Sequence, residues 1–598
     1  MTAIDTAWFF HPSILFVVTA ALLPWFTDWQ GRNKILFIAP LVAIAVVFTQ
    51  TWNGDGQGVT WTIPYIGTTL KLARVDTLSL VFANVFAIQS FIAFIYAYHE
   101  KDPMKHVATC LYVAGAFGCV FAGDYLTLFI FWELMSIAST GVIWLARNPA
   151  ATRAGFRYFL FHVMGGLLLL GGMLLRWQAL GTFDFTPADP ANIATYDWLI
   201  MAGFCVNAAA VPLHAWLPDA YPRASITGAV FLSAFTTKTA VYVLARAFSG
   251  FEVLAVVGVV MCLYGVFYAT IENNARKILS YHIVSQVGYM VAGIGIGTAM
   301  TINGACAHAY AHILYKGLLF MGTGCLLYAA GTAKLTELGG LVSRLPFVML
   351  FYMVGAVSIS GMPLFNGFIS KTMTIAGAAE AHHTWMALGM ELAAVGTFLS
   401  VGIKLPYFAF WSKPDSTVEL KPIPKNMYIA MGISSFLCLF TGLFPSTLYS
   451  ILPFEVEYHP YTAWHVLQSS ILLAFTGLGF YFCRKIIVPH DKVNLDFDAL
   501  YRFVARWFYK LVSVPVAAID NVWTEVYAKI GLRGLMGSAW LSAIFDRKAI
   551  DTVVDGTAYT VRGTGSLAAK GQTGRLQDYI AATAVICLGL FALYWYFI

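Results

Sequence analysis

Charged residues are scarce in this sequence. Asp, Glu, Lys and Arg make up 11% of the 598 residues, whereas 59% are hydrophobic, and a typical soluble domain is about 25% charged. The basic residues leave a net charge of +6, but they stand in short segments between apolar stretches. Because they form no run or patch, nothing indicates a nucleic-acid-binding face. The composition predicts an integral membrane protein.

Cysteine pairs are also missing. The nine cysteines stand singly, mostly inside apolar runs, and none forms a CxxC motif. This spacing indicates neither a disulfide framework nor a zinc or iron–sulfur site. The sequence contains no nucleotide fingerprint or flavin motif, and no basic segment precedes the first apolar run as in a cleavable signal. We therefore expect no cofactor and no metal in this chain, and we expect its first apolar run to be a retained span.

Apolar runs of about 20 residues, the length that crosses a bilayer, recur along the chain. They predict an all-α polytopic membrane protein with about sixteen transmembrane helices, one of them interrupted. The runs lie near residues 9–26, 35–52, 76–98, 106–122, 124–146, 156–180, 197–217, 225–248, 251–271, 279–297, 302–330, 345–382, 386–411, 426–447, 464–483 and 577–598.

The loop charges support this count. If the N-terminus lies outside, the loops on the inside all contain Lys or Arg, as the positive-inside rule requires. The outside loops 181–196 and 448–463 carry acidic residues and neither Lys nor Arg. Lys71 and Arg74 are the exceptions. A single missed span would reverse the alternation, so the agreement favours the predicted order.

The chain changes character between residues 493 and 576. The stretch "NLDFDALYRFVARWFYKLV" alternates apolar and charged residues at helical spacing, which is typical of an amphipathic helix at a membrane surface. The following Gly- and Thr-rich stretch, residues 555–575, is expected to be irregular. A packing or tethering role is the simplest interpretation of this segment.

Several charged residues fall inside the predicted spans, where each costs about 2.5–3.5 kcal/mol on insertion scales. They are Glu133, Lys238, the set His308, His312 and Lys316, then Lys371 and Lys404. The set at 308, 312 and 316 lies along one helix face. Such a stripe can relay protons through bound water, because imidazole titrates near neutrality. Structurally satisfied histidines and a metal pair are the alternatives, although no further ligands are near in sequence.

Glu133 and Lys238 need partners, since an unpaired buried charge is costly. An ion pair between them could act as an electrostatic switch or be static. Lys404 lies toward the inner end of its span, where its ammonium could extend to the surface.

Prolines interrupt two of the predicted spans, and a proline inside a helix costs about 3 kcal/mol or more. One is the stretch "FCVNAAAVPLHAWLPDAYPRAS", with Pro212, His214, Pro218 and Asp219; the other is "SISGMPLFNG", with Pro363. Broken helices in corresponding places of two halves predict an inverted-repeat transporter whose path runs at the breaks. Backbone irregularity at membrane depth is tolerated only in buried, polar places.

These stretches resemble the antiporter-like subunits shared by respiratory complex I, Mrp-type multisubunit cation/proton antiporters and membrane-bound hydrogenases. The matching stretches cover roughly residues 75–415 in the family's order: "FIFWELMSIAS", "VPLHAWLPDAY", "TTKTAVYVLAR", "NNARKILSYHIVSQVGYM", "AHAYAHILYKGLLFMGTG" and "SISGMPLFNGFISK". The resemblance implies two inverted five-helix repeats, with the seventh and twelfth helices broken.

The resemblance also implies boundaries and roles. The expected divisions are 1–105 (N-terminal helices), 106–250 and 251–412 (the two repeats), 413–492 (additional helices), 493–576 (amphipathic lateral segment) and 577–598 (final helix). Glu133 matches the family's carboxylate on helix 5 and Lys238 the bridging residue of helix 8. His308, His312 and Lys316 match the central relay of helix 11, and Lys371 the ionisable residue of helix 12.

One position departs from the family pattern. Asn207 stands where the family has a helix 7 lysine that pairs with the helix 5 carboxylate. Glu133 would then need another partner, for which Lys238 is the first candidate and His162 the second. Without this lysine, the family's Glu–Lys electrostatic switch is in question for the first half of the chain. The ionisable residues of the second half, from Lys316 to Lys371, match the family pattern.

The resemblance implies a proton-translocating subunit of a multisubunit complex in a prokaryotic cell membrane. The core resembles the D-type subunit of Mrp antiporters, whereas the C-terminal segment resembles the most distal antiporter-like subunit of complex I. The expected partners are other membrane subunits and lipids, with protons and, in an antiporter, Na⁺ as the transported ions, and no nucleic acid. Any redox chemistry would belong to partner subunits. A non-conducting scaffold and a stand-alone secondary transporter are the alternatives.

Overall fold

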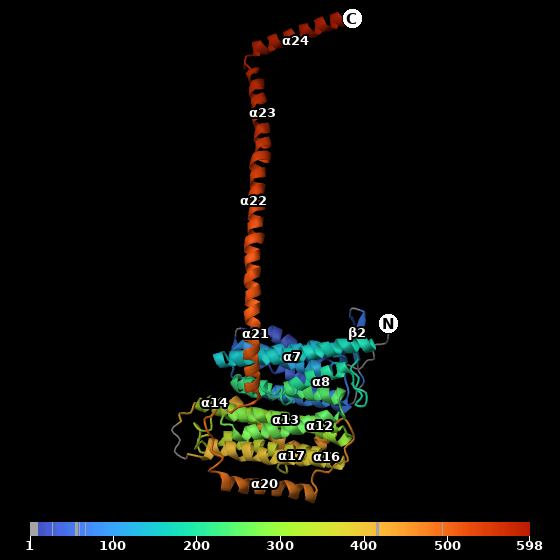
Figure 1. Ribbon diagram of the computed structural model, residues 1–598, viewed down its shortest axis with the longest axis vertical. Coiled ribbons are helices and arrows are strands. Elements are labelled where there is room, and N and C mark those ends of the chain that lie inside the picture. The colour runs from blue at the N-terminus through green and yellow to red at the C-terminus, as the bar shows by residue number, and fades with distance from the viewer. Residues whose placement is uncertain are drawn as a thin grey trace. The chain divides into compact units, whose positions relative to one another are not determined.

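The structure is a computed structural model that describes residues 10–26, 28–53, 58, 60–65, 67–413, 418–492 and 494–598. The chain divides into two compact units, Met1–Phe497 and Asp498–Ile598. Helices make up nearly all of both units. In the first unit, α7 (Pro149–Leu180) packs against α8 (Thr195–Asn207), and α12 (Glu252–Ile271) packs against α13 (Ala275–Ile296) and α17 (Thr384–Thr397). Helix α16 (Asn366–Glu380) also packs against α17 (Figure 1).

The helices of the first unit follow the predicted runs. They are α1 (Pro12–Leu22), α2 (Trp29–Ile35), α3 (Ile38–Asn53), α4 (Thr77–Tyr96), α5 (Pro103–Phe121), α6 (Tyr125–Trp144), α7 (Pro149–Leu180), α8 (Thr195–Asn207), α9 (Trp216–Ala220), α10 (Ile226–Leu232), α11 (Thr236–Ala247), α12 (Glu252–Ile271), α13 (Ala275–Ile296), α14 (Ala299–Ala330), α15 (Pro346–Ser360), α16 (Asn366–Glu380), α17 (Thr384–Thr397), α18 (Lys425–Leu443), α19 (Ser446–Tyr449) and α20 (Ala463–Cys483). The short segments are η1 (Leu23–Trp25), η2 (Tyr221–Arg223), and the π-helical η3 (Phe398–Lys404) and η4 (Tyr407–Trp411).

Twelve helices of the described chain are long and apolar enough to cross a membrane. The predicted count of about sixteen is larger for identifiable reasons. Helices α1 and α15 are shorter than a full span, and α8 ends at its break after 13 residues. Helix α13 has the length of a span, but its polar residues, among them His282 and Gln286, lower its hydropathy.

A two-stranded hairpin, which was not predicted from the sequence, follows α3. Strands β1 (Thr60–Tyr65) and β2 (Thr68–Arg74) pair antiparallel, with Tyr65 opposite Thr68. Lys71 lies on β2 and forms an ion pair of 2.6 Å with Asp184. Arg74 pairs with Asp76 at 3.1 Å. Neighbouring carboxylates therefore neutralise the two cations that departed from the charge rule.

Both predicted helix breaks are present, together with a third. The chain leaves helical geometry between α8 and α9 and between α15 and α16. Leu364 has φ 79°, a left-handed value that bulky residues seldom adopt and that a continuous helix excludes. Residues 233–235 separate α10 from α11, a break that no proline signals.

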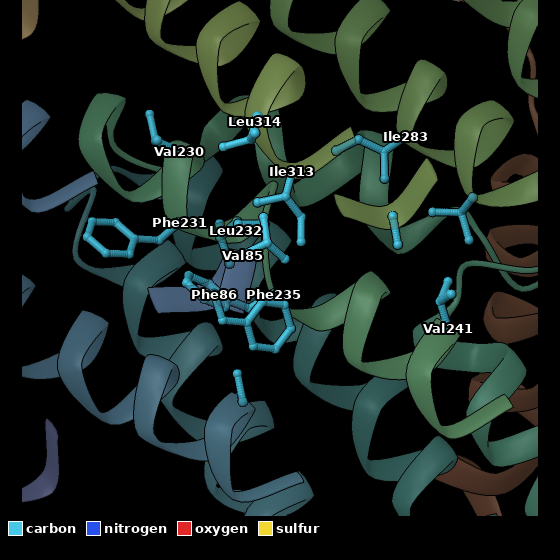
Figure 2. Close-up of a cluster of buried hydrophobic side chains, with 14 of the residues drawn as sticks. Val85, Phe86, Val230, Phe231, Leu232, Phe235, Val241, Ile283, Ile313 and Leu314 are labelled. Atoms are coloured by element: carbon cyan, nitrogen blue, oxygen red, sulfur yellow. The ribbon is translucent and has the colours of Figure 1, made fainter. Parts of the chain in front are cut away.

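The hydrophobic core surrounds the helices that carry the buried lysines. Val85 and Phe86 of α4, Phe231 of α10 and Phe235 of the third break pack together with Ile313 of α14 (Figure 2). Each of these side chains is fully buried. Burial of this kind contributes roughly 25 cal/mol per Å² of apolar surface removed from water, although in a membrane the gain comes largely from close packing.

The second unit consists of consecutive helical segments: α21 (Phe497–Val526), η5 (Tyr527–Leu532), α22 (Arg533–Phe545), η6 (Asp546–Ile550), α23 (Asp551–Lys570) and α24 (Leu576–Phe597). The prediction that residues 555–575 are irregular is wrong for most of its length, because α23 covers it up to Lys570. The prediction rested on the glycines of this stretch, because each glycine destabilises a helix by about 1 kcal/mol relative to alanine. The hydroxyls of Thr557, Thr560 and Thr564 donate to the carbonyls four residues earlier, so these polar groups are satisfied within the helix.

Candidate functional site

Lys238 is the first of three buried lysines at the centre of the first unit. It lies in the first turn of α11, directly after the third helix break, and is 0% exposed. Its Nζ donates to the Ser233 carbonyl at 2.7 Å and to the Thr237 hydroxyl at 3.1 Å. The break thus supplies a free backbone carbonyl that binds the amine.

Helix α14 carries the predicted set His308, His312 and Lys316, and all three side chains are fully buried. Lys316 Nζ donates to the Leu279 carbonyl of α13 at 3.3 Å. His308 Nδ1 lies 2.9 Å from the Ser370 hydroxyl of α16. The imidazole centroids of His308 and His312 are 6.3 Å apart. The structure therefore places the predicted stripe between α13 and α16.

Lys371 lies in the second turn of α16 and is 3% exposed. Its Nζ donates to the Ile359 carbonyl at 2.6 Å, next to the break between α15 and α16. It also lies 5.0 Å from the centroid of the Tyr289 ring. A cation over an aromatic face is attracted to the ring, so two neutral groups hold this amine.

The three lysines form one series. Lys316 lies within electrostatic range of both Lys238 and Lys371, and His312 lies within range of all three. Within the part of the chain that the structure describes, none of the three lysines forms an ion pair. The series is therefore a row of basic groups held by carbonyls, hydroxyls and one ring.

The Lys404 ammonium does not extend to the surface, as its position in the sequence had suggested it could. It is 1% exposed and lies in the π-helical segment η3. Its Nζ donates to the carbonyls of Thr270 at 2.6 Å and Glu272 at 2.8 Å, at the end of α12. Lys404 therefore caps a helix C-terminus, where a cation is favourable.

Glu133 does not have the partner that the sequence suggested. Its Oε1 is buried without a hydrogen-bond partner among the described residues, and it lies against α7, where it occupies the space that a Cβ at Gly166 would fill. The predicted pairing with Lys238 is wrong, because the Lys238 amine is bound at the third break instead. His162 stacks on Tyr158 at 3.9 Å, and its Nδ1 contacts the Tyr158 carbonyl.

Asn207, at the end of α8, is fully buried, and neither atom of its side-chain amide has a hydrogen-bond partner in the described chain. Both ring nitrogens of His312 and both amide atoms of Gln89 are likewise buried without a hydrogen-bond partner among the described residues. Gln89 lies against Gly317, next to Lys316. Buried polar atoms are nearly always hydrogen-bonded to protein or water. These groups therefore indicate a hydrated interior.

The residues of the first break have structural partners. Pro212 stands in the non-helical segment between α8 and α9, and Pro218 lies within the short α9. Asp219 accepts two hydrogen bonds from Arg157 of α7, at 2.7 and 2.9 Å, and also pairs with Arg223. At the second break, Pro363 stands between α15 and α16.

A carboxylate that was not predicted from the sequence joins the first break to α12 and α13. Asp496 Oδ1 lies 3.3 Å from His214 Nε2 and accepts a hydrogen bond from Tyr264 of α12. Asp496 Oδ2 accepts a hydrogen bond of 2.7 Å from Tyr281 of α13. Burial acts to raise the pKa of Asp496, but His214 and the two tyrosine hydroxyls outweigh it and lower the pKa to about 2.

The neighbours of Asp496 are fixed as well. Tyr268 donates to the Leu495 carbonyl at 2.9 Å, and the Asn494 amide donates to Glu272 at 3.4 Å. We call residues 494–497 the strap. In the sequence, the strap opens the stretch predicted to be an amphipathic surface helix, and only the structure brings its carboxylate to His214.

Comparison with known proteins identifies the class. A family described as "NADH:quinone oxidoreductase/Mrp antiporter, TM" matches residues 122–400. The D-type Na⁺/H⁺ antiporter subunit from Alkalihalophilus pseudofirmus is 30% identical over 385 residues, which cover 60% of this chain and 76% of that protein. The chain belongs to this family of antiporter-like membrane subunits.

Two further comparisons extend beyond the family core. The chloroplastic NAD(P)H-quinone oxidoreductase subunit 5 of Chara vulgaris is 26% identical over 552 residues, covering 83% of this chain and 81% of that one. In the Mrp complex of a Dietzia species, one chain shares the fold with a TM-score of 0.69 at 22% identity, over 78% of this chain and 98% of that chain. The protein is an antiporter-like subunit of an energy-converting membrane complex.

Proposed function

We propose that this subunit conducts protons through a hydrated series formed by Lys238, Lys316 and Lys371, with His308 and His312 beside it. The observation that supports the proposal is the absence of an acidic partner for all three lysines among the described residues. A lysine at mid-membrane costs about 2.5–3.5 kcal/mol on insertion scales, and intramembrane ionisable residues usually mark an ion path. Without ion pairs, a purely structural role does not offset this cost.

The unpartnered polar atoms of His312 and Gln89 support the same proposal, because these side chains lie beside the basic groups and require water. Water molecules joined to imidazoles and amines form the hydrogen-bonded chain along which a proton moves. In this proposal, the partners are other membrane subunits and lipids of a prokaryotic cell membrane. Na⁺ is the counter-transported ion if the parent complex is an Mrp-type antiporter, and no ion is exchanged if it is a quinone oxidoreductase.

Lys316→Ala tests the proposal in the purified complex reconstituted into liposomes. We expect the proton flux, followed with an internal pH dye, to fall at least about tenfold, because positioned proton donors contribute 10²–10⁴-fold to transfer rates. The matched control is Lys334→Ala, which removes a surface lysine that pairs with Asp491 at 2.8 Å. Unchanged flux in Lys316→Ala, with the subunit composition preserved, contradicts proton conduction by this chain.

A non-conducting scaffold is the second candidate, and the first half of the molecule favours it. Asn207 carries no charge, and Glu133 has no ion-pair partner in the described residues. Asn207→Lys separates the candidates. In a conducting subunit it restores a charge beside the first break, and we expect it to change the coupling of the complex while assembly is preserved. In a scaffold, both Asn207→Lys and Lys316→Ala leave the flux of the complex unchanged.

A further inference from the structure

His282 is a fully buried histidine of α13 that lies outside the proposed series. Its Nε2 lies 2.6 Å from the hydroxyl of Ser400 in the π-helical segment η3, and that hydroxyl donates to the Gly396 carbonyl, also at 2.6 Å. Because the hydroxyl proton is engaged there, the serine oxygen accepts a hydrogen bond from the Nε2 proton. In the neutral ring, Nδ1 is then the basic nitrogen.

The basic nitrogen of His282 has no hydrogen-bond partner among the described residues, although it is buried. Buried polar atoms are nearly always bonded to protein or water, so this nitrogen requires a water molecule. An imidazole nitrogen with a free lone pair on water can accept a proton from it. A purely structural histidine would need only the contact with Ser400 and would leave Nδ1 unexplained.

Lys316 reaches α13 beside the turn that carries His282. Its Nζ donates to the carbonyl of Leu279 at 3.3 Å. Leu279 and His282 are three residues apart, so they lie on the same side of the helix, about 4.5 Å apart along its axis. A helix carbonyl points toward the C-terminal end, which is the direction of His282. The amine of Lys316 therefore lies next to the imidazole's turn of α13.

Ser400 lies near the second helix break, where the Lys371 amine is bound. A Cβ at Gly402, two residues further along η3, would lie 3.0 Å from the Ser360 hydroxyl at the end of α15. The residue before it, Ile359, provides the carbonyl that accepts a hydrogen bond from Lys371 at 2.6 Å. The serine that holds the imidazole is thus part of the wall of this break, and π-helical turns such as η3 are frequent at functional sites.

His282 is therefore the histidine placed between Lys316 and Lys371, and it lies within electrostatic range of both. His308 differs from it in two ways. It lies within range of Lys238 and Lys371, and hydroxyl groups contact both of its ring nitrogens.

We propose that His282 relays the proton from Lys316 to Lys371. The proposal rests on the proposed function and names a further residue of that path. The Lys316 ammonium gives a proton through water to Nδ1 of His282, so the lysine becomes a neutral amine and the ring an imidazolium. The Nδ1 proton then passes through water to the neutral amine of Lys371, which becomes an ammonium, and the ring is neutral again. Ser400 is a positioning residue, because it keeps the other proton on Nε2 throughout.

His282→Gln tests the relay in the reconstituted complex. Glutamine places an amide near the position of Nε2, where it can still donate to Ser400, but it carries no titratable nitrogen. We expect the proton flux to fall at least about tenfold at unchanged subunit composition and melting temperature. His106→Gln is the matched control and should keep its flux, because this histidine is also buried and contacts the Glu100 carbonyl at 3.1 Å. Full flux in His282→Gln overturns the assignment.

A double variant separates a relay step from a packing effect. If His282 and Lys371 act in one step, His282→Gln combined with Lys371→Ala should conduct no more slowly than the slower single variant. If His282→Gln disturbs only the packing, the two decreases should multiply, because independent effects are additive in free energy. Multiplied decreases would contradict the relay.

Substitutions of Ser400 provide a test if His282→Gln prevents assembly. Ser400→Thr keeps the hydroxyl and should retain the flux and its pH profile. Ser400→Ala removes the partner of Nε2, so the proton of the neutral ring can occupy either nitrogen; we expect a lower flux and a changed pH profile. The same flux and pH profile in both variants would show that the orientation of His282 is irrelevant and would overturn the proposal.

The two proposals fail separately. If Lys316→Ala abolishes the flux while His282→Gln does not, the subunit conducts protons, but they pass from Lys316 to Lys371 by another route. If Lys316→Ala has no effect, proton conduction itself is refuted, and the relay is refuted with it.

Discussion

Asp496→Asn removes the charge of the strap and nearly preserves its shape. The carboxylate is 6% exposed and contacts His214, Tyr264 and Tyr281. Its pKa is lowered from an ordinary value of 3.8 to about 2. A difference of one pKa unit corresponds to about 1.36 kcal/mol, so the ionised form stabilises the attachment of the strap by about 2–3 kcal/mol. Loss of this free energy should make transient detachment of the strap roughly thirty- to one-hundred-and-fifty-fold more frequent.

Hydrogen–deuterium exchange of the intact complex measures this detachment. We expect amides of the peptide around residues 494–497 to exchange faster by that factor in Asp496→Asn, while peptides of α14 remain unchanged. Asp498→Asn is the matched control, because Asp498 pairs with Arg502 one helical turn away, at a surface-exposed site. Equal exchange of the strap in Asp496→Asn and Asp498→Asn would refute the reasoning.

The pH dependence follows from the same shift. The folded-state pKa of Asp496 lies below its ordinary value, so its contribution is fully present above about pH 4 and is lost as the pH falls through about 2. Strap exchange, corrected for intrinsic chemistry, should therefore show no pH dependence from Asp496 between about pH 5 and 8, because its contribution is full and constant there. A change in strap detachment within that range would indicate that another group controls it.

Two glycine substitutions test close approaches of helices. In Gly166→Ala, the new Cβ would collide with Glu133 Oε1 and displace this flexible side chain, so we expect reduced proton flux at unchanged assembly. The control is Gly171→Ala on the same helix, where a Cβ meets no atom within 4 Å. Gly288→Ala places a Cβ 2.5 Å from the Gly258 carbonyl of α12, so the backbone must shift, and the thermal stability of the complex should fall by an amount typical of overpacking, about 1–3 kcal/mol. Wild-type flux in Gly166→Ala, or wild-type melting in Gly288→Ala, would contradict the respective packing.

Helices could be predicted from the sequence wherever apolar length alone determines the structure. The runs that became α4, α6 and α12 have full membrane length and few polar residues, so no alternative fold satisfies their backbone in lipid. The breaks at Pro212 and Pro363 were predicted because proline removes a backbone donor. The break before Lys238 was not predicted, since no proline or glycine marks it.

Partnerships between distant residues could not be predicted in the same way. The sequence places Glu133 and Lys238 on different helices, but it does not show that a break would offer the Ser233 carbonyl to the lysine. Asp496 stands at the start of the predicted amphipathic stretch, where charged residues are expected to face water, so nothing in its sequence context points to His214. Side-chain pairing depends on helix rotation and on backbone irregularity, and hydrophobic periodicity specifies neither.

The carbonyl groups that bind Lys238, Lys316 and Lys371 have a consequence for repeated turnover. A carboxylate attracts an ammonium much more strongly than an uncharged amine, so a lysine bound to a carboxylate loosens when it is deprotonated. A neutral amine still carries two N–H donors and can keep its bond to a backbone oxygen. Each of these side chains can therefore stay in place through a complete cycle of losing and regaining a proton, and the chain need not rebuild the site between cycles.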